Sequence, residues 1–322
     1  MMTMVPEKIL NSGHRMPCLG MGTAAFPSAP PQVIESAVIA AIELGYRHFD
    51  TASLYQSEPP LGRAISQALK QGLVASRDDF FITTKLWTGH AHPDLVVPAL
   101  RGSLKALGLD YVDLYLIHFP ASEKGKDAVI SFEIKKEDLL PLDMKGVWQA
   151  MEECSRLGLT KSIGVSNFSC KKLSQLLDLA TIPPAVNQVE LHPVWQQKKL
   201  REFCAENGIH VSAFHPLGGS GGGSGTNAVS ESDQMKQIAQ SKGKTIAQIC
   251  LRWAYQQGVI TIPKSYNKER QKQNMEIFDW ELSTEELQKI SMLPQKRLFT
   301  LEQLVSEGGL FKSLSDLWDG EI

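Results

Sequence analysis

Short apolar runs alternate with segments of helical periodicity along almost the whole chain. In the helical segments, apolar residues recur every three or four positions, as in Ile34, Val38, Ala41 and Ile42, and this spacing predicts amphipathic helices. The runs between them are rich in β-branched or apolar residues and often end in a polar residue, which is typical of short buried strands. The predicted strands are 18–22, 48–50, 80–84, 112–118, 162–165, 185–189, 210–214 and 259–262.

This alternation predicts an α/β protein, because strands that are connected through helices pair in parallel by right-handed crossovers. A doubly wound sheet would show the same alternation, but no predicted strand is followed by G-x-G-x-x-G and the eight units are roughly even. We therefore expect a (β/α)8 TIM barrel, formed by a single domain over residues 1–322. A hairpin at 7–17 should precede the barrel, and a C-terminal segment at 294–322 should pack on it.

One stretch, GGSGGGSG at 218–225, has the composition of a flexible linker between domains. A predicted strand ends just before it, and a helix and a strand follow, so a domain boundary there would interrupt the repeat. We interpret it as a flexible loop between a strand and a helix, lying over the face where the strands end.

Four polar residues stand at or just after the ends of consecutive predicted strands. They are Asp50 and Tyr55 in HFDTASLYQSE, Lys85 in ITTKLW and His118 in LYLIHFP. Each alone has an ordinary explanation, such as helix capping by Asp50 or a solvated loop lysine at position 85. The C-terminal ends of barrel strands meet at one face, which is where TIM-barrel enzymes have their active sites. The four together therefore predict a catalytic site on that face.

These residue types suit the reduction of a carbonyl group by hydride transfer. Hydride delivery leaves negative charge on oxygen, and this oxygen needs a proton in the transition state. Tyr55 would donate it, and the Lys85 ammonium would lower the phenol's pKa from its ordinary value of about 10. Asp50 would pair with the buried lysine, while His118 would donate a hydrogen bond and orient the substrate.

The same segments, with SIGVSNFS, AVNQVELHP and IPKS, resemble the signature blocks of the aldo-keto reductases, in order from about residue 5 to residue 322. LPLDMKGVWQAMEEC, LREFCAENGIHVSA and NMEIFDWELS most resemble the plant branch that contains chalcone reductase, codeinone reductase and methylecgonone reductase. The resemblance implies a (β/α)8 barrel, NADPH/NADP+ as cofactor, no metal, and a substrate covered by the C-terminal segment. It makes Tyr55 the general acid, Lys85 and Asp50 the pair that adjusts the pKa of Tyr55, and His118 the residue that orients the substrate.

The resemblance also implies a cofactor site. Ser166, Asn167 and Gln188 match the positions that hold the nicotinamide carboxamide, and Phe214 matches an aromatic residue that stacks on the nicotinamide ring. The glycine-rich loop at 218–225 matches the segment that folds over the pyrophosphate. The full set of expected cofactor-binding residues is Gly22, Thr23, Asp50, Ser166, Asn167, Gln188, Phe214, His215, Leu217, Lys264, Ser265, Arg270 and Asn274.

Four members of that set, Lys264, Ser265, Arg270 and Asn274, match the site of the adenosine 2′-phosphate. Two cations suit a phosphate better than a bare ribose, which favours NADPH over NADH.

The substrate pocket departs from the commoner family pattern. Phe119 follows His118 where many members carry tryptophan, so the wall stays aromatic but loses an indole N–H donor. Ala24, Ala25 and Phe26 follow Gly22 and Thr23 where some relatives have tryptophan, which suggests a wide pocket. Members that reduce an enone carbon–carbon bond carry glutamate in place of His118, so carbonyl reduction is expected here. The expected pocket residues are Ala24, Ala25, Phe26, Trp87, Phe119, Trp195 and Phe299, with His192 and Phe311 as further candidates.

The composition indicates which kinds of partner and which cellular compartment to expect. The net charge of -2 shows no basic excess of the kind that binds nucleic acid. No apolar run approaches the roughly 18 residues that span a bilayer, and the N-terminus lacks a signal-peptide pattern. Five scattered cysteines indicate neither disulfides nor zinc but a reducing compartment, and His90 and His92 lack a third metal ligand. We expect a cytoplasmic monomer that acts on a small-molecule carbonyl.

The sequence therefore predicts NADPH-dependent reduction of a ketone or aldehyde to an alcohol. The small residues at the pocket positions favour a bulky carbonyl of plant specialised metabolism, such as an alkaloid, polyketide or steroid. A broad-specificity detoxifying aldehyde reductase is the alternative enzyme. A non-catalytic NADPH-binding subunit is a third hypothesis, but a pure binder has no chemical need for Tyr55, Lys85, Asp50 and His118 together.

Overall fold

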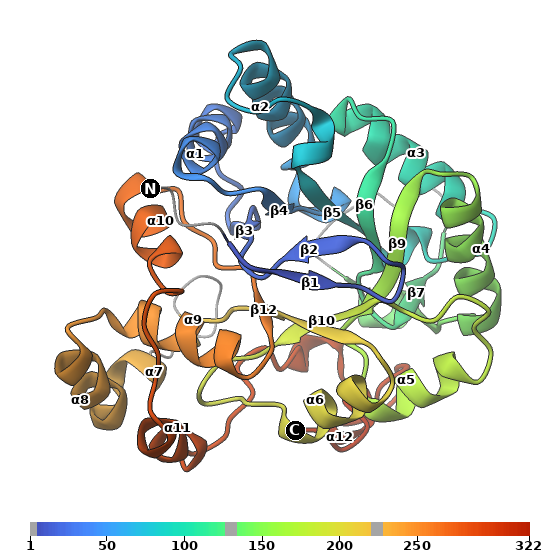
Figure 1. The fold of residues 1–322 in the computed structure, drawn as a ribbon. Coiled ribbons are helices and arrows are strands. Elements are labelled where there is room, and N and C mark those ends of the chain that lie inside the picture. Colours follow the sequence, from blue (N-terminus) through green and yellow to red (C-terminus); the bar gives the residue numbers. More distant parts are fainter. Residues whose placement is uncertain (1–4, 126–133, 220–227) are drawn as a thin grey trace.

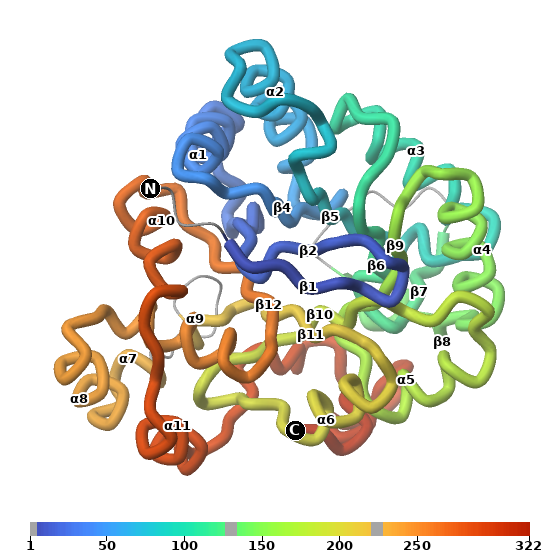
Figure 2. Tube along the Cα trace, viewed as in Figure 1, coloured from blue at the N-terminus to red at the C-terminus, as the bar shows by residue number. Residues whose placement is uncertain are grey.

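One sheet of eight parallel strands forms the centre of the computed structural model, which describes residues 5–125, 134–219 and 228–322 (Figure 1). The strands follow one another in the sheet in the same order as in the chain. Figure 2 shows the chain passing once round the sheet, from blue through green and yellow to orange. The strands are β3 (Met21–Gly22), β4 (His48–Asp50), β5 (Phe81–Leu86), β6 (Val112–Ile117), β9 (Thr160–Ser166), β10 (Val186–Glu190), β11 (His210–Phe214) and β12 (Ile260–Thr261).

The first and last strands meet, and the sheet closes. Leu19 and Thr261 form a parallel bridge, and the Thr261 amide donates to the Cys18 carbonyl at 2.9 Å. Further along, the Gly22 amide donates to the Pro263 carbonyl at 3.1 Å. The prediction of a (β/α)8 barrel is confirmed.

Helices surround the barrel and bury their apolar stripes against it. In α1, the predicted face of Ile34, Val38, Ala41 and Ile42 is buried, and the helix ends at Gly45, whose φ of 104° is a left-handed conformation that glycine adopts without strain. The helices are α1 (Pro31–Leu44), α2 (Glu58–Lys70), α3 (Val96–Leu107), α4 (Met144–Arg156), α5 (Cys170–Leu177), α6 (Lys198–Glu206), α7 (Ala228–Glu231), α8 (Asp233–Lys242), α9 (Ile246–Gln256), α10 (Lys268–Met275), α11 (Thr284–Ser291) and α12 (Leu314–Leu317).

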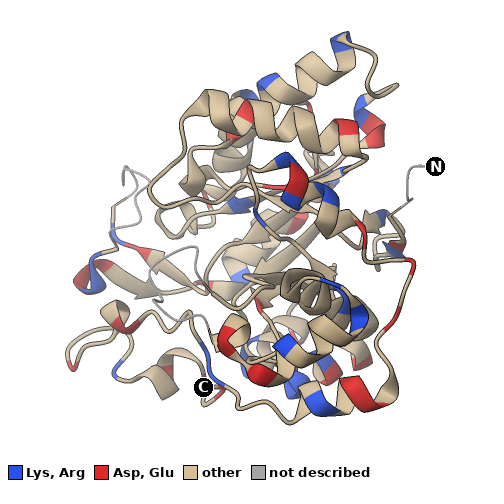
Figure 3. Ribbon diagram, turned by 90° about the vertical axis from the view of Figure 1, so that its left-hand side faces the viewer, with Lys and Arg blue, Asp and Glu red and all other residues tan. Residues whose placement is uncertain are grey.

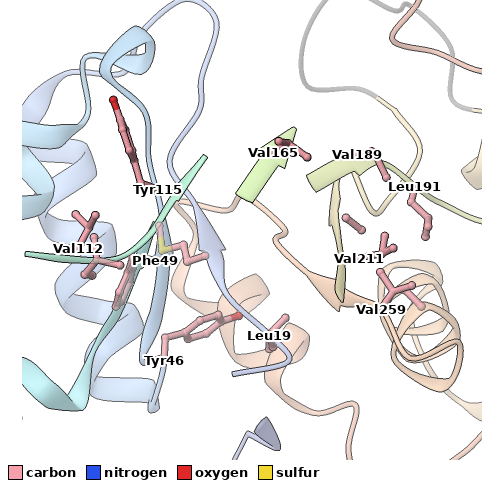
Figure 4. Packing of buried hydrophobic residues seen from close by; sticks show 14 of the residues in the cluster. Leu19, Tyr46, Phe49, Val112, Tyr115, Val165, Val189, Leu191, Val211 and Val259 are labelled. Carbon is pink, nitrogen blue, oxygen red and sulfur yellow. The ribbon is translucent and has the colours of Figure 1, made fainter. Parts of the chain in front are cut away.

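Strand β6 shows how the two sides of the barrel wall divide the core. Tyr115 and Ile117 belong to the large cluster between the strands and the helices, part of which is drawn in Figure 4. Leu114 and Leu116 belong to a smaller cluster inside the barrel. This division follows from the alternation of side chains along a strand.

A short hairpin closes one end of the barrel. Strands β1 (Glu7–Ile9) and β2 (Arg15–Pro17) pair antiparallel and cross the near end of the barrel in Figure 1. Leu10 and Met16 from this hairpin pack among the interior side chains of the sheet. Because this end is filled by apolar side chains, the chemistry must lie at the other end, where the strands have their C-termini.

A second antiparallel pair, β7 (Ala121–Glu123) with β8 (Leu139–Pro141), lies between β6 and α4 in the chain and was not predicted. These strands have only three residues each, so no alternation of apolar and polar positions marks them. They form part of the wall on which the C-terminal segment packs, since Ala121 and Leu139 contact the cluster that contains Phe311 and Trp318.

The C-terminal segment at 294–322 is attached to the barrel by its far end as well as by apolar packing. The Asp319 carboxylate pairs with Lys172, accepts from the Ser169 hydroxyl at 2.6 Å and lies 3.3 Å from the Lys171 ammonium. The amide of Cys170 donates to the Glu321 carboxylate at 2.9 Å. These contacts hold the end of the chain at the start of α5.

Lysine and arginine are interspersed with aspartate and glutamate over the outer helices and loops (Figure 3). Within the described residues, no helix combines the length and the apolar character needed to cross a membrane. All five cysteines are buried and free.

Candidate active site

A buried ion pair lies at the base of the open end of the barrel. The Lys85 ammonium on β5 donates to the Asp50 carboxylate at 2.5 Å and to the Thr51 carbonyl at 2.9 Å. From β10, on the opposite side of the barrel, the Gln188 amide donates to the other oxygen of Asp50 at 2.8 Å. Lys85 is 1% exposed and Asp50 is 4% exposed. The carboxylate therefore neutralises a buried cation and is itself hydrogen-bonded, as a buried charge requires.

Tyr55 lies above this pair. It ends a short 3-10 helix, Ser53–Tyr55, that directly follows β4, and this tight turn brings the tyrosine back over the barrel. The Lys85 ammonium lies 4.9 Å from the centroid of the Tyr55 ring. The Tyr55 hydroxyl lies 3.1 Å from His118 Nε2, and the two rings meet edge to face. The four residues predicted from the strand ends are thus brought together.

The electrostatics of the group differ from the expectation in one respect. Burial, reinforced by the negative charge of Asp50, raises the pKa of Tyr55 well above its ordinary value, whereas we expected Lys85 to lower it. Burial also lowers the pKa of Lys85, although Asp50 opposes this, and burial and the Lys85 charge hold the pKa of His118 well below its ordinary value. Tyr55 therefore keeps its proton, and His118 is neutral near pH 7.

An amide-rich cluster lies beside the ion pair. The Ser166 hydroxyl donates to the Gln188 carbonyl at 2.8 Å, and the Asn167 amide donates to the His118 carbonyl at 3.0 Å. Asn167 has a φ of 64°, a left-handed conformation that asparagine tolerates better than most residues. Its Oδ1 is buried and has no hydrogen-bond partner among the residues that the structure describes. A buried acceptor of this kind fits the NH₂ of a nicotinamide carboxamide.

Aromatic rings line the mouth above the cluster. The Phe214 ring at the end of β11 lies 5.4 Å from the Phe299 ring and 5.3 Å from the His215 ring. His215 has a φ of 48° and is exposed, and Leu217 packs against the main core. Most of the glycine-rich stretch at 218–225 lies outside the described residues, so its expected contact with a pyrophosphate remains a prediction.

The residues expected at the 2′-phosphate lie around the start of α10. Lys264 and Arg270 are exposed, and neither makes a salt bridge within residues 5–125, 134–219 and 228–322. Ser265 is half-buried, and Asn274 is 6% exposed. Two exposed cations near a helix N-terminus fit a phosphate group. At the strand end, a Cβ on Gly22 would lie 3.3 Å from Ile262 and 3.8 Å from Lys264, so glycine keeps this part of the wall thin.

The expected pocket residues described next lie in three places. Trp87 packs edge to face on His118 at 5.1 Å, and Phe119 packs on Phe311 and Trp318 at 6.4 and 6.3 Å. On the loop after β3, Ala24 and Ala25 are half-buried and Phe26 is exposed. Trp195, by contrast, lies under the guanidinium of Arg297 at 4.8 Å.

Several polar contacts of the site were not predicted from the sequence. A chain of hydroxyls runs from Thr23 through Ser57 to Thr51, with oxygen–oxygen distances of 2.7 and 2.8 Å, and the Tyr266 hydroxyl donates to the Thr23 carbonyl at 2.8 Å. Glu190 is fully buried beside His192. Thr51 and Ser57 lie in the segment HFDTASLYQSE, and Glu190 and His192 lie in AVNQVELHP, but the segments alone do not show which of these side chains contact one another.

His90 ends the short 3-10 helix Thr88–His90 that follows β5, and His92 comes two residues later. No group of three or more histidine, cysteine, aspartate or glutamate side chains with metal-binding proximity occurs in the described part of the chain. His92 Nε2 instead hydrogen-bonds the Glu123 carbonyl at 2.8 Å.

Comparison with known proteins identifies the class. The model of the Aldo/keto reductase family matches residues 18–293, and the chain therefore belongs to this family. The chain is an oxidoreductase that acts on carbonyl and alcohol groups with NADP as cofactor, and the predictions of family, cofactor and enzyme class are confirmed.

Among curated proteins, the chain is similar to two plant enzymes over nearly its whole length. It is 54% identical to the (1S)-1,7-diacetoxy-luvungin A aldo-keto reductase of Citrus sinensis, over 99% of both chains. It is 53% identical to deoxymugineic acid synthase 1 of Oryza sativa subsp. japonica, over 97% of both. Among solved structures, the Bombyx mori aldo-keto reductase in complex with NADP has a TM-score of 0.83 and 38% identity, over 93% of this chain and 96% of that one.

Proposed function

We propose that this reductase converts a ketone or aldehyde to an alcohol with Tyr55 as the proton donor. The observation that carries the proposal is the Tyr55 hydroxyl, 3.1 Å from His118 Nε2 and above the buried pair of Lys85 and Asp50. Bound NADPH supplies the hydride. Tyr55 gives its proton to the carbonyl oxygen, because its raised pKa keeps it protonated until that oxygen becomes basic.

The neighbours of Tyr55 make this proton transfer easier. The Lys85 ammonium, 4.9 Å from the ring centroid, stabilises the negative charge left on the phenol after the proton has gone. Asp50 keeps the buried lysine charged and in place. His118 is neutral, so its Nε2 can hydrogen-bond the reacting oxygen without adding a second charge.

For the cofactor, we propose that Asn167, with Ser166 and Gln188, holds the nicotinamide carboxamide through the unpartnered Oδ1 of Asn167. Phe214 would pack on the nicotinamide ring, and Lys264 and Arg270 would bind the 2′-phosphate. We keep the other expected cofactor-binding residues in the proposal, with Ser265 and Asn274 beside the phosphate and with Gly22, Thr23, His215 and Leu217 as contacts to which no individual role is assigned.

The substrate is proposed to be a bulky carbonyl of plant specialised metabolism. Relatives at 54 and 55% identity are named as aldo-keto reductases of luvungin and neemfruitin derivatives, from Citrus sinensis and Melia azedarach. Ala24 and Ala25 have small side chains and are half-buried, and Trp87 and Phe119 offer aromatic surface near His118. A large cyclic ketone would bury apolar surface against these rings.

We also infer that residues 1–322 form one domain and that the enzyme is a cytoplasmic monomer with no nucleic-acid or membrane partner. The closing bridge between Leu19 and Thr261 supports the single domain. Five free, buried cysteines support a reducing compartment, and the mixed surface charge supports the absence of a nucleic-acid partner.

The test is NADPH oxidation, followed by absorbance, with a panel of aromatic aldehydes, small aliphatic aldehydes, alkaloid ketones and 3-ketosteroids. The proposal expects turnover with a preference for the large ketones and its loss in Tyr55→Phe. Equal turnover of all small aldehydes would indicate the broad-specificity detoxifying enzyme instead. Tight NADPH binding without consumption of any carbonyl would favour a non-catalytic subunit.

A further inference from the structure

Glu190 is a buried carboxylate to which the reaction assigns no part. It is the last residue of β10, two positions after Gln188, so both side chains lie on the same face of the strand. Gln188 reaches across the barrel to Asp50. Glu190, with an exposed fraction of 0%, turns to a different partner, the start of the C-terminal segment.

Glu190 contacts two backbone amides and the side chain of His192. Its Oε1 accepts from the amides of Leu298 and Phe299, both at 3.1 Å, and its Oε2 accepts from the Phe299 amide at 3.0 Å. His192 Nε2 donates to Oε1 at 3.1 Å. Burial acts to raise the pKa of Glu190, but the His192 hydrogen bond, the Phe299 amide and the Arg297 charge outweigh it, so the pKa lies below its ordinary value. The group is therefore an anion at neutral pH.

The segment that Glu190 holds leads directly to the mouth of the site. The Phe299 ring packs on Phe214, the residue proposed to contact the nicotinamide. Beyond Phe299, the chain places Phe311 and Trp318 against Phe119 and is attached again through Asp319 at the start of α5. The segment is thus attached through Glu190 at its start, through apolar packing on Phe119 along its length and through Asp319 at its end, and Glu190 sets the position of the end nearer the cofactor.

We propose that Glu190 is a positioning residue that holds Phe299 over the mouth and thereby determines how tightly a bulky substrate is bound. It touches neither substrate nor cofactor and acts through the backbone of 298–299. The inference rests on the proposed function, because it takes the space below the C-terminal segment as the pocket for the carbonyl compound.

The decisive variant is Glu190→Gln, which keeps the shape of the side chain but replaces one acceptor oxygen by a donor and removes the charge. We expect KM for a 3-ketosteroid to rise about tenfold, because hydrogen bonds to charged groups that order the pocket wall are lost. For propionaldehyde, which is too small to reach Phe299, kcat and KM should stay within about twofold. NADPH affinity, measured by quenching of protein fluorescence, should also stay within about twofold.

Glu152→Gln is the matched control. Glu152 on α4 is 3% exposed and accepts from the amides of Thr181 and Ile182 at 2.7 and 2.8 Å, so it is another buried carboxylate that binds two consecutive amides, but in the outer layer. The Glu152→Gln variant should lower the stability of the fold as Glu190→Gln does, and it should leave KM unchanged for both the 3-ketosteroid and propionaldehyde. An equal rise of KM for both substrates in Glu190→Gln, or a similar rise in Glu152→Gln, would overturn the proposal.

Hydrogen exchange tests the anchor without relying on activity. The amides of Leu298 and Phe299 should be protected in the wild type and exchange faster in Glu190→Gln, while those of α11 are unchanged. If both amides exchange fast in the wild type, Glu190 does not hold them, and the inference is refuted even if the enzyme reduces ketones. If the wild type is inactive but both amides are protected, only the proposed function is refuted. If Glu190→Gln does not fold, Phe299→Ala should give the same selective rise in KM with the anchor intact, and a normal KM would contradict the proposal.

Discussion

The Nε2 atom of His118 lies 3.1 Å from the hydroxyl of Tyr55, although the two residues are 63 positions apart in the chain. A carbonyl oxygen placed beside this hydroxyl would meet both a proton donor and a neutral imidazole. The pair therefore defines where the reacting oxygen has to be, and the predictions below begin from it.

Tyr55→Phe removes the proton donor and leaves the ring. We expect kcat to fall by about 10²- to 10⁴-fold, the range for loss of a general acid, with little change in NADPH affinity. Stopped-flow absorbance of NADPH and fluorescence titration measure the two quantities. Retention of more than about a tenth of the wild-type kcat would contradict the assignment of Tyr55 as the acid.

Asp50→Asn leaves the buried Lys85 ammonium without its countercharge. We expect the free energy of unfolding to fall by about 3–5 kcal/mol, because removing one partner of a buried ion pair leaves an uncompensated charge. Urea denaturation followed by circular dichroism measures this. In the double variant Asp50→Asn, Lys85→Met, the free energy of unfolding should fall by less than the sum of its decreases in the two single variants. If the two decreases simply add, the pair is not coupled.

Acid stability should depend on His48. Burial lowers the pKa of this fully buried imidazole from 6.5 to about 4, although Asp50 opposes the shift. The unfolded chain binds a proton there that the folded chain does not, so the free energy of unfolding falls as pH decreases from about 6.5 to 4, by about 3 kcal/mol in all. His118 adds to the loss in the same direction.

His48→Gln should therefore show a smaller drop in unfolding free energy between pH 7 and pH 4.5 than the wild type. Urea titrations at the two pH values measure this drop. His14→Gln, at an exposed position, is the control and should leave the drop unchanged. An identical drop in His48→Gln and the wild type would show that His48 does not take up the proton.

Arg270→Ala should raise the Kd for NADPH about tenfold and leave the Kd for NADH unchanged, because only NADPH carries the 2′-phosphate. Lys268→Ala is a control on the same helix, since the Lys268 ammonium is occupied by the Glu43 carboxylate at 2.7 Å. Fluorescence titration with NADPH and with NADH gives the Kd values of the two variants for comparison with the wild type. Equal weakening of NADH and NADPH would place Arg270 away from the phosphate.

The barrel and its reactive end were predictable because both rest on local patterns. Short apolar runs ended in Asp50, Lys85 and His118, and parallel strands bring such ends together without further information. The missed strand pair β7 and β8 has too few residues to show a period.

Other features of the site depend on packing, which no local pattern carries. The raised pKa of Tyr55 follows from its burial beside Asp50, whereas the types of its neighbours suggested the opposite direction. The link between Glu190 and the amides of Leu298 and Phe299 joins a side chain to backbone groups more than a hundred positions away, and any residue except proline at 298 or 299 would supply the same donors.

The attachment of the C-terminal segment also bears on how new substrate preferences can arise. Between the Glu190 contact and the Asp319 contact, the segment packs Phe311 and Trp318 on Phe119, and it contributes none of Tyr55, Lys85, Asp50 and His118. Exchanges that keep the aromatic contacts with Phe119 should leave these four residues in place. The segment from 300 to 318 is therefore an exchangeable cassette, and transplanting it between relatives should transfer preference for a carbonyl compound without rebuilding the proton donor.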